Sequence, residues 1–375
     1  MFKIKRDLNS IIERHRSFFN CEEVKRPLFC ISVAGKGFAE AYSRTFGKIT
    51  KNKEVLPEDI DIENYIKDVD DFISWTEEIG VDMFYPVSPF LYIPWMEAIV
   101  GCPIYTGKDS FYTKPCIKNW EDFDWKINLS ENNRWLKKLL EMTEALVDHL
   151  EGRYPIASST HLRGPADIMS AAIGQKEFPL ELYDNPENIK KIGKIYTDAF
   201  ISVARMLNNI ARKSKFAGFI VNIFGIWTYD VCQFFQDDAV VFLSPRFYRE
   251  FILKNHLTID SSFSSTLYHI HPTTLFVVDE LIKFPNLKII EINRDPENIS
   301  PSLGEMMPYF KKIQESGKAL LINFTDIDFS PELIERETKL ACENLVYKGL
   351  CIFVTVKNIE DGKRILKSVK KIFKV

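Results

Sequence analysis

The sequence lacks a hydrophobic run long enough to cross a membrane. A membrane-spanning helix needs roughly 18 or more consecutive apolar residues, and the longest candidate stretch, residues 216–227, is interrupted by Asn222. Residues 1–16 alternate charged and apolar side chains, and they have neither the apolar core nor the small-residue cleavage site of a signal peptide. We therefore expect a cytoplasmic protein with no membrane partner.

The sequence also lacks an excess of either charge, and it lacks a disulfide pattern. Its 49 lysines and arginines stand against 52 aspartates and glutamates, a net charge of −3, so no overall field attracts nucleic acid. The seven cysteines are odd in number and form no C-x-x-C pair, which is typical of reduced thiols. Because 46% of the residues are hydrophobic, the chain can bury a large core, and general disorder is excluded.

Short apolar runs alternate with longer helical patterns along the chain. The strand candidates are residues 28–33, 81–85, 154–158, 219–223, 266–271, 288–293, 319–324 and 350–356. Helix starts are marked by a capping residue followed by proline, at Asn185-Pro186, Ser244-Pro245, Asp295-Pro296, Ser300-Pro301 and Ser330-Pro331. This alternation favours a parallel sheet with covering helices, and eight strands favour a closed (β/α)₈ TIM barrel over an open doubly wound sheet, which is the alternative.

We expect one α/β barrel domain over residues 1–375, in which residues 1–26 form an N-terminal helical extension. The polar segment 109–133 separates the second strand candidate from a long helix predicted at 134–150. We interpret this segment as an excursion over the barrel rather than as a domain linker.

The fifth strand candidate carries two histidines with the spacing of metal ligands. In a (β/α)₈ barrel the active site lies at the C-terminal ends of the strands. His269 and His271 are two residues apart at such an end, so their side chains point to the same face. A metal needs a third ligand, and Cys351 in the last strand candidate could converge on the same place. The alternatives are a hydrogen-bonded histidine pair without metal and an ordinary buried thiol.

Carboxylates lie near other predicted strand ends. Asp237 and Asp238 precede the capped helix start at Ser244, where either could orient a histidine or bind substrate, the alternative being a solvated loop pair. Glu291 and Asn293 share one face of the sixth strand candidate. A buried carboxylate at such a position is a candidate acid, base or ion-pair partner.

Several segments together resemble the uroporphyrinogen decarboxylase superfamily, whose fold is a single (β/α)₈ barrel. Residues 27–36 are similar to the P-V-W-x-M-R-Q-A-G-R motif of the decarboxylases, and residues 243–251 to the L-S-P-x-x-F-x-E-F motif. Gly164-Pro165 with Gly174 resembles the G-A-P helix start, and residues 221–227 resemble V-Q-I-F-D-S-W. The resemblance spans most of the chain and implies the same barrel.

The departures from the family motifs fall on substrate-binding and catalytic positions. Ser32 and Lys36 stand where the decarboxylases have arginines, and Pro89 stands where they have the catalytic aspartate. A substrate with eight carboxylates needs guanidinium groups that grip in a bidentate manner, which serine and lysine do not provide. The resemblance therefore implies a divergent member that does not act on uroporphyrinogen.

Another branch of the superfamily consists of zinc-dependent methyltransferases that work with corrinoids. Their zinc is held by an H-x-C motif on the fifth strand and a cysteine on the last strand, which implies His269, His271 and Cys351 as the zinc ligands here. The zinc binds and deprotonates a thiol. No D-x-H-x-x-G corrinoid motif occurs in this chain, so a corrinoid would be carried by a partner protein.

We therefore expect an enzyme that moves a methyl group between a corrinoid protein and a small acceptor. The alternatives are a decarboxylase-like lyase acting on another small-molecule substrate, and a non-catalytic barrel that binds a tetrapyrrole or corrinoid. The site predictions are catalysis by Asp237, Asp238 and Glu291, cofactor binding by Lys36, Tyr229 and Asn293, and metal binding by His269, His271 and Cys351.

Overall fold

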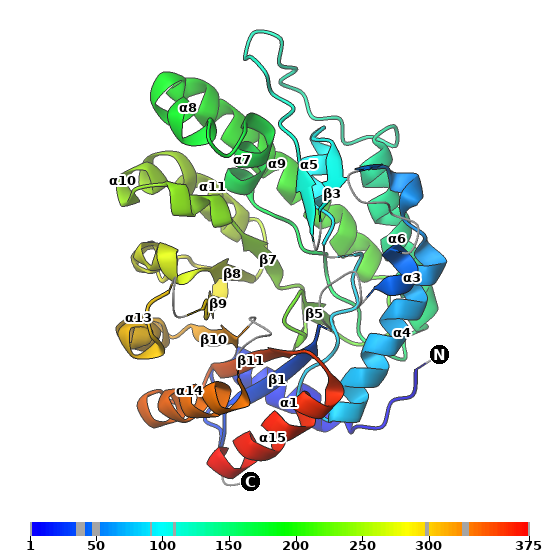
Figure 1. Ribbon diagram of the computed structural model, residues 1–375, viewed down its shortest axis with the longest axis vertical. Helices are drawn as coiled ribbons and strands as arrows, with labels where there is room; N and C mark the ends of the chain where they lie inside the picture. The colour runs from blue at the N-terminus through cyan, green and yellow to red at the C-terminus, as the bar shows by residue number, and fades with distance from the viewer. Residues whose placement is uncertain are drawn as a thin grey trace.

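The computed structural model describes an α/β protein built on a six-stranded parallel sheet (Figure 1). The described residues are 2–34, 42–46, 53–90, 92–107, 110–296, 300–324 and 330–373, so Lys36 lies outside them. The strand order is β1-β11-β10-β9-β8-β7. The bounds are β1 (Leu28–Val33), β7 (Gln233–Gln236), β8 (Thr266–Ile270), β9 (Leu287–Asn293), β10 (Ala319–Phe324) and β11 (Leu350–Val356).

The first strand candidate and the last four candidates are thus confirmed as neighbours in one parallel sheet. Every residue of β10 is buried, and β11 is buried except at Thr355, which exposes part of its surface. Strands buried on both faces are expected where helices cover the outer face. On that face Ile31 lies next to Gly362 of the helix α15, where a Cβ atom would be 3.5 Å from the isoleucine side chain.

Helices surround the strands on their outer side, as Figure 1 shows for α11, α13, α14 and α15. The helix bounds are α1 (Leu8–Phe19), α3 (Ser43–Phe46), α4 (Ile62–Ile79), α5 (Trp95–Ile99), α6 (Arg134–Leu150), α7 (Pro165–Ile173), α8 (Phe178–Asp184), α9 (Pro186–Ala211), α10 (Pro245–Phe247), α11 (Leu253–Ser261), α12 (Val278–Leu281), α13 (Leu303–Glu315), α14 (Pro331–Asn344) and α15 (Ile359–Phe373). No helix in the described ranges is both long enough and apolar enough to span a bilayer.

Capping chemistry explains most of the helix starts. The hydroxyl of Ser330 accepts a hydrogen bond from the Leu333 N–H, and α14 begins at the predicted proline. The helix α13 starts two residues later than Ser300-Pro301 predicted, because Ser302 and Glu305 form a reciprocal capping box. The predicted helix at 134–150 is confirmed as α6, and α1 lies in the predicted N-terminal extension.

The remaining strand candidates take less regular forms. Residues 81–85 and 154–158 are extended segments without a full strand, and a few backbone hydrogen bonds join them to their neighbours. Asp82 N–H donates to the Phe29 carbonyl at 3.3 Å, and Ala157 N–H donates to the Val87 carbonyl at 2.8 Å. An isolated parallel bridge then joins Ala157 to Ile220.

The fourth strand candidate, 219–223, forms a hairpin instead of a long strand. The strand β5 (Phe219–Val221) pairs antiparallel with β6 (Ile226–Thr228), and the chain then enters β7, which the sequence did not indicate. The segment 111–113 forms β4, which belongs to a second small sheet with the order β2 (Glu54–Val55), β3 (Ile104–Thr106), β4 (Phe111–Thr113). The predicted excursion at 109–133 therefore begins with a strand.

Candidate metal centre

The two histidines of the fifth strand candidate lie together at the C-terminal end of β8. His269 is in the strand and His271 directly follows its last residue. Their ring centroids are 4.8 Å apart, with the ring planes perpendicular. His269 is buried, whereas the side chain of His271 is one-third exposed. The prediction that both imidazoles occupy the same space is confirmed.

Each imidazole is held through Nδ1 by a carboxylate. His269 Nδ1 contacts Glu291, its register partner on β9, and His271 Nδ1 lies 2.9 Å from Asp295 Oδ2. An imidazole that donates its Nδ1 proton to a carboxylate presents a free lone pair at Nε2, the arrangement found around metal-bound histidines. Both Nε2 atoms lie 3.7 Å from the same oxygen, Oδ1 of Asp238.

Asp238, His269 and His271 therefore form a candidate metal centre. Their ligand atoms all lie within 4.8 Å of one another. In a tetrahedral zinc site with bonds of about 2.0 to 2.2 Å, ligand atoms are about 3.4 Å apart, so small side-chain shifts would complete the site. Two imidazoles and one carboxylate form a donor set that zinc accepts readily, and they leave a fourth position open. Asp238 was predicted as catalytic, and here it is the third member of the candidate cluster.

The Asp238 carboxylate is oriented by a chain of two neighbours. The amide of Gln236, the last residue of β7, donates to Asp238 Oδ2 at 2.9 Å, and the Gln236 amide oxygen lies 2.9 Å from His161 Nε2. Burial is the main reason that the pKa of His161 is lowered, to about 4, so this imidazole is neutral and donates to Gln236. Oδ2 is thus fixed while Oδ1 faces the histidine pair.

Burial and the Glu291 carboxylate shift the pKa of His269 in opposite directions. Burial lowers its pKa, but the Glu291 carboxylate outweighs this effect, and the pKa rises to about 9. Without a metal the imidazole binds a proton at neutral pH. A metal ion at Nε2 must therefore displace that proton.

Cys351 is not brought to the cluster. It is the second residue of β11, its Sγ lies 3.9 Å from the Sγ of Cys30, and both thiols are buried. Burial also raises the pKa of the Cys351 thiol, which disfavours the thiolate that a metal needs. The prediction failed because Cys351 lies near the start of its strand, whereas the histidines lie at the end of theirs.

Asp237 and Glu291, which were predicted as catalytic, each contact a histidine. Asp237 is buried, its Oδ2 lies 2.6 Å from His256 Nε2, and its Oδ1 accepts from the Asp167 N–H at 2.8 Å. A Cβ atom at Gly164 would be 2.7 Å from Asp237 Oδ2, so glycine is required at the start of α7. Glu291 is fully buried against His269, which it orients.

The predicted cofactor-binding residues are not found at one site. Asn293 donates through Nδ2 to Asp295 Oδ1 at 2.5 Å, so it supports the carboxylate that holds His271. Tyr229 is 82% exposed and follows β6. Its neighbour Asp230 contacts Ser264, just before β8, so Tyr229 lies at the N-terminal ends of the strands. A residue that the sequence reasoning missed is Asp295, although its place just after β9 was a usable signal.

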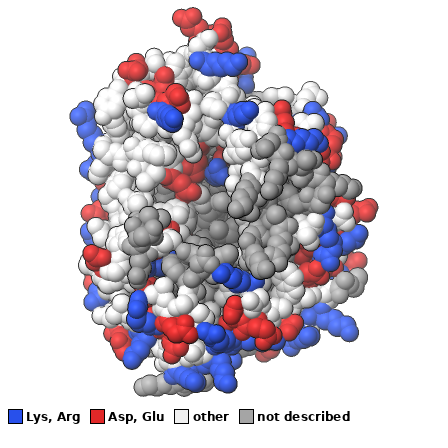
Figure 2. All heavy atoms as spheres, in the orientation of Figure 1, with Lys and Arg blue, Asp and Glu red and all other residues white. Residues whose placement is uncertain are grey.

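A cavity of about 730 Å³ adjoins the metal centre. Asp238 lines it, together with Arg163 and Asp167. On the face shown in Figure 2, acidic and basic side chains lie next to each other near the middle of the molecule. Burial, followed by the charge of Asp238, raises the pKa of Asp167 and favours its protonated form.

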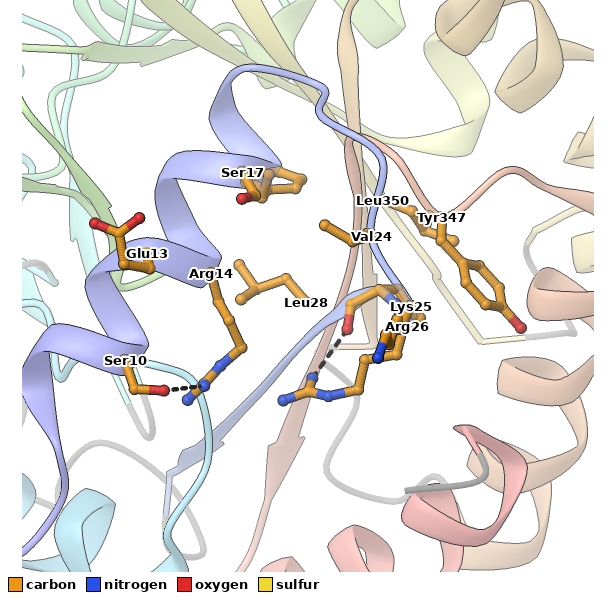
Figure 3. A pocket seen from close by; sticks show the side chains of 12 residues that line it. Ser10, Glu13, Arg14, Ser17, Val24, Lys25, Arg26, Leu28, Tyr347 and Leu350 are labelled. Atoms are coloured by element: carbon orange, nitrogen blue, oxygen red, sulfur yellow. Dashed lines mark hydrogen bonds between the residues drawn. The ribbon is translucent and has the colours of Figure 1, made fainter.

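A second cavity, of about 430 Å³, lies at the opposite end of the strands between α1 and the start of β1 (Figure 3). Arg14 and Arg26 line it, but both are paired with Asp82, at 2.7 and 2.6 Å. In barrel enzymes, residues at the N-terminal ends of the strands contribute to stability rather than to catalysis. We place no function there.

Comparison with protein-family models and with curated proteins found no significant match to this chain. The superfamily resemblance thus stays a prediction that rests on the motifs alone.

Proposed function

We propose that the protein is a (β/α)₈-barrel metalloenzyme that transfers a methyl group between a corrinoid on a partner protein and a small acceptor. The observation that carries the metal assignment is the geometry of the two imidazoles. Both Nδ1 atoms face carboxylates, of Glu291 and Asp295, and both Nε2 atoms face Asp238. A plain hydrogen-bonded histidine pair does not need this arrangement.

Backbone contacts support closure of the sheet into a barrel. From β1 they run to the segment 81–87, and from there to residues 154–158. A parallel bridge between Arg163 and Gln236 then reaches β7, the other edge of the six-stranded sheet. In this arrangement the metal centre lies at the C-terminal ends of the strands, where barrel enzymes have their active sites.

The chain's own residues hold and orient the centre. Glu291 and Asp295 fix the two imidazoles, and Gln236 fixes Asp238, whose side chain is about half exposed and lines the cavity. Zinc bound there would act as a Lewis acid and lower the pKa of an acceptor thiol. The three ligands leave the fourth position for that acceptor.

A decarboxylase-like lyase is the second candidate, because Arg163 and Asp167 line the adjoining cavity and offer groups that hold a carboxylic acid. A non-catalytic barrel that binds a tetrapyrrole or corrinoid is the third candidate, and it does not require an open metal position.

The metal content of the purified protein tests the proposal. Protein prepared without a histidine tag or chelator should carry about one equivalent of zinc, and His269→Ala or His271→Ala should lose it. Cys351→Ala is the matched control and should keep the zinc, because its thiol lies beside Cys30 and outside the cluster. A zinc-free wild type that takes up no added zinc would refute the assignment.

The transferase step needs a separate assay. With methylcobalamin and 2-mercaptoethanol, the zinc-loaded wild type should demethylate the corrinoid faster than His269→Ala does. Equal rates in both proteins would refute the methyltransferase function, and the lyase and the non-catalytic binding protein would be the candidates that are left.

A further inference from the structure

Arg163 lines the cavity beside the metal centre, and a buried carboxylate holds its guanidinium group in place. Arg163 Nη1 donates to Glu97 Oε1 at 2.9 Å, and Glu97 in α5 is fully buried. The next residue, Gly164, donates its N–H to the Gln236 carbonyl at 2.7 Å. The Arg163 side chain is nevertheless 36% exposed and lines the cavity. Since a guanidinium has five N–H donors in a planar fork, the Glu97 contact fixes it and leaves donors for a ligand.

The carboxylate of Asp167 in the same wall also indicates that the cavity binds a ligand. Asp167 Oδ1 accepts a hydrogen bond from the Ala239 N–H at 2.7 Å. Its other oxygen, Oδ2, is buried and has no hydrogen-bond partner among the described residues. Asp167 also lines the cavity. Because an unpaired buried polar atom is unfavourable, a ligand that bonds to Oδ2 would be stabilised.

The rest of the wall is mixed, with aromatic rings beside polar side chains such as Thr113, Ser170 and Gln175. Phe111 and Tyr112 of β4 line one part, and Phe242 lines another. Tyr112 and Phe242 are 42% and 47% exposed, so their rings are accessible to a ligand. The other charged lining residues are Lys176 and Glu177, whose charges offset one another, and Asp238, which faces the histidines.

We propose that this cavity binds the substrate as an aromatic carboxylic acid, with its carboxylate gripped by Arg163 and its ring between the aromatic side chains. The Asp167 oxygen accepts or donates the remaining hydrogen bond, and the far side of the substrate is presented to the Asp238 side of the metal centre. The inference names the substrate class of the proposed enzyme and so rests on that function.

Binding of benzoate tests this inference, with benzamide as the neutral probe of the same shape. Titration calorimetry on the full-length protein as purified should show benzoate binding at least about tenfold more tightly than benzamide, because charged hydrogen bonds to a guanidinium are the stronger ones. Arg163→Lys keeps a positive charge beside Glu97 but loses the fork, and it should weaken benzoate binding about tenfold.

A double variant keeps the inference testable if the Arg163→Lys variant does not fold. The double variant Glu97→Gln with Arg163→Gln removes both members of the buried pair, so no single charge is left uncompensated. It should not bind benzoate, whereas Arg246→Gln, which alters an arginine whose side chain is 85% exposed, should bind it like the wild type. Equal affinity for benzoate and benzamide, no benzoate binding by the wild type, or unchanged binding in both Arg163 variants would overturn the inference.

Titration with and without zinc separates the metal assignment from the substrate class. The titration is repeated after treatment with a chelator, since Arg163 binds the carboxylate without help from the metal. A wild type that takes up no added zinc but binds benzoate through Arg163 would refute only the metal assignment. Zinc-loaded protein that binds neither probe would refute only the substrate class.

Discussion

At the scale of single residues, the two ring nitrogens of each histidine have different roles. Nδ1 of His269 and of His271 is engaged by a carboxylate, and Nε2 is directed at Asp238. Such outer carboxylates raise the basicity of the ligand and fix its orientation, and their loss weakens metal binding by about 10- to 100-fold.

We therefore predict that Glu291→Gln weakens zinc binding by about 10- to 100-fold without abolishing it. In the zinc-free protein the same change should lower the pKa of His269 from about 9, because burial then acts without the opposing carboxylate. Competition with a chromophoric chelator and an NMR titration of the imidazole measure the two effects. Glu187→Gln, whose side chain is 85% exposed, is the control, and an equal loss in that variant would contradict the account.

Zinc affinity should also depend on pH. Below its pKa of about 9, His269 binds a proton that zinc must displace, so the apparent affinity should rise about tenfold for each pH unit between about pH 7 and pH 8.5. The slope is measured with the same chelator at several pH values. An affinity that does not change with pH would show that His269 is not a ligand.

The sequence predicted that the two histidines lie together, but it offered Cys351 rather than Asp238 as the third candidate ligand. The i, i+2 spacing in a strand was sufficient to bring His269 and His271 together, since it depends only on local geometry. Asp238 lies two residues after the end of β7, whereas Cys351 is the second residue of β11, and the choice between them depends on how far along the sheet each residue lies. That distance is set by the register of the sheet, which local patterns do not determine.

At the scale of elements, the helix α1 is tied to the sheet region by one buried histidine. His15 Nε2 donates to the Asp82 carbonyl at 2.6 Å, and Nδ1 accepts from the Trp227 N–H at 2.8 Å. Burial lowers the pKa of His15 to about 4, so the imidazole is neutral in the folded protein. Both bonds fit this neutral form, because Nδ1 must keep its lone pair.

Folding stability should fall in acid because of this residue. The folded pKa of His15 lies below the unfolded value of about 6.5, so the stabilisation is present above about pH 6.5 and is lost as the pH falls toward 4, on the order of 3 kcal/mol in total. His15→Gln should lower the melting temperature at about pH 7, and the difference from the wild type should shrink near pH 4.5. A difference that is constant over this range would contradict the account.

The strands that the sequence predicted well are those with long runs of apolar residues. β9, β10 and β11 are buried except at Lys288 and Thr355, and each forms over nearly the expected residues. The strand β7, Gln233–Gln236, was missed because it is short and bounded by glutamines. Its pairing with β8 depends on tertiary contacts rather than on its own sequence.

At the scale of the whole molecule, the residues at the positions of the decarboxylase motifs lack the side-chain groups that those motifs supply. Pro89 stands where those enzymes have an aspartate, and its carbonyl accepts a hydrogen bond from the Thr160 hydroxyl at 2.6 Å. Its ring has no group that can hold or move a proton. Ser32 in β1 likewise offers no guanidinium for the carboxylates of a tetrapyrrole.

We therefore predict no decarboxylation of uroporphyrinogen above background. Product analysis by chromatography and release of labelled carbon dioxide measure the reaction. Conversion to coproporphyrinogen at an enzymatic rate would show that other residues replace Ser32 and Pro89.

X-ray absorption spectroscopy at the zinc edge of the purified protein tests the ligands of the metal centre most directly. The account predicts a first shell of nitrogen and oxygen atoms at about 2.0 to 2.2 Å, from His269, His271 and Asp238, with no sulfur from the protein. A sulfur scatterer at about 2.3 Å in protein free of added thiols would contradict it, because Cys351 would then be a ligand and Asp238 would not.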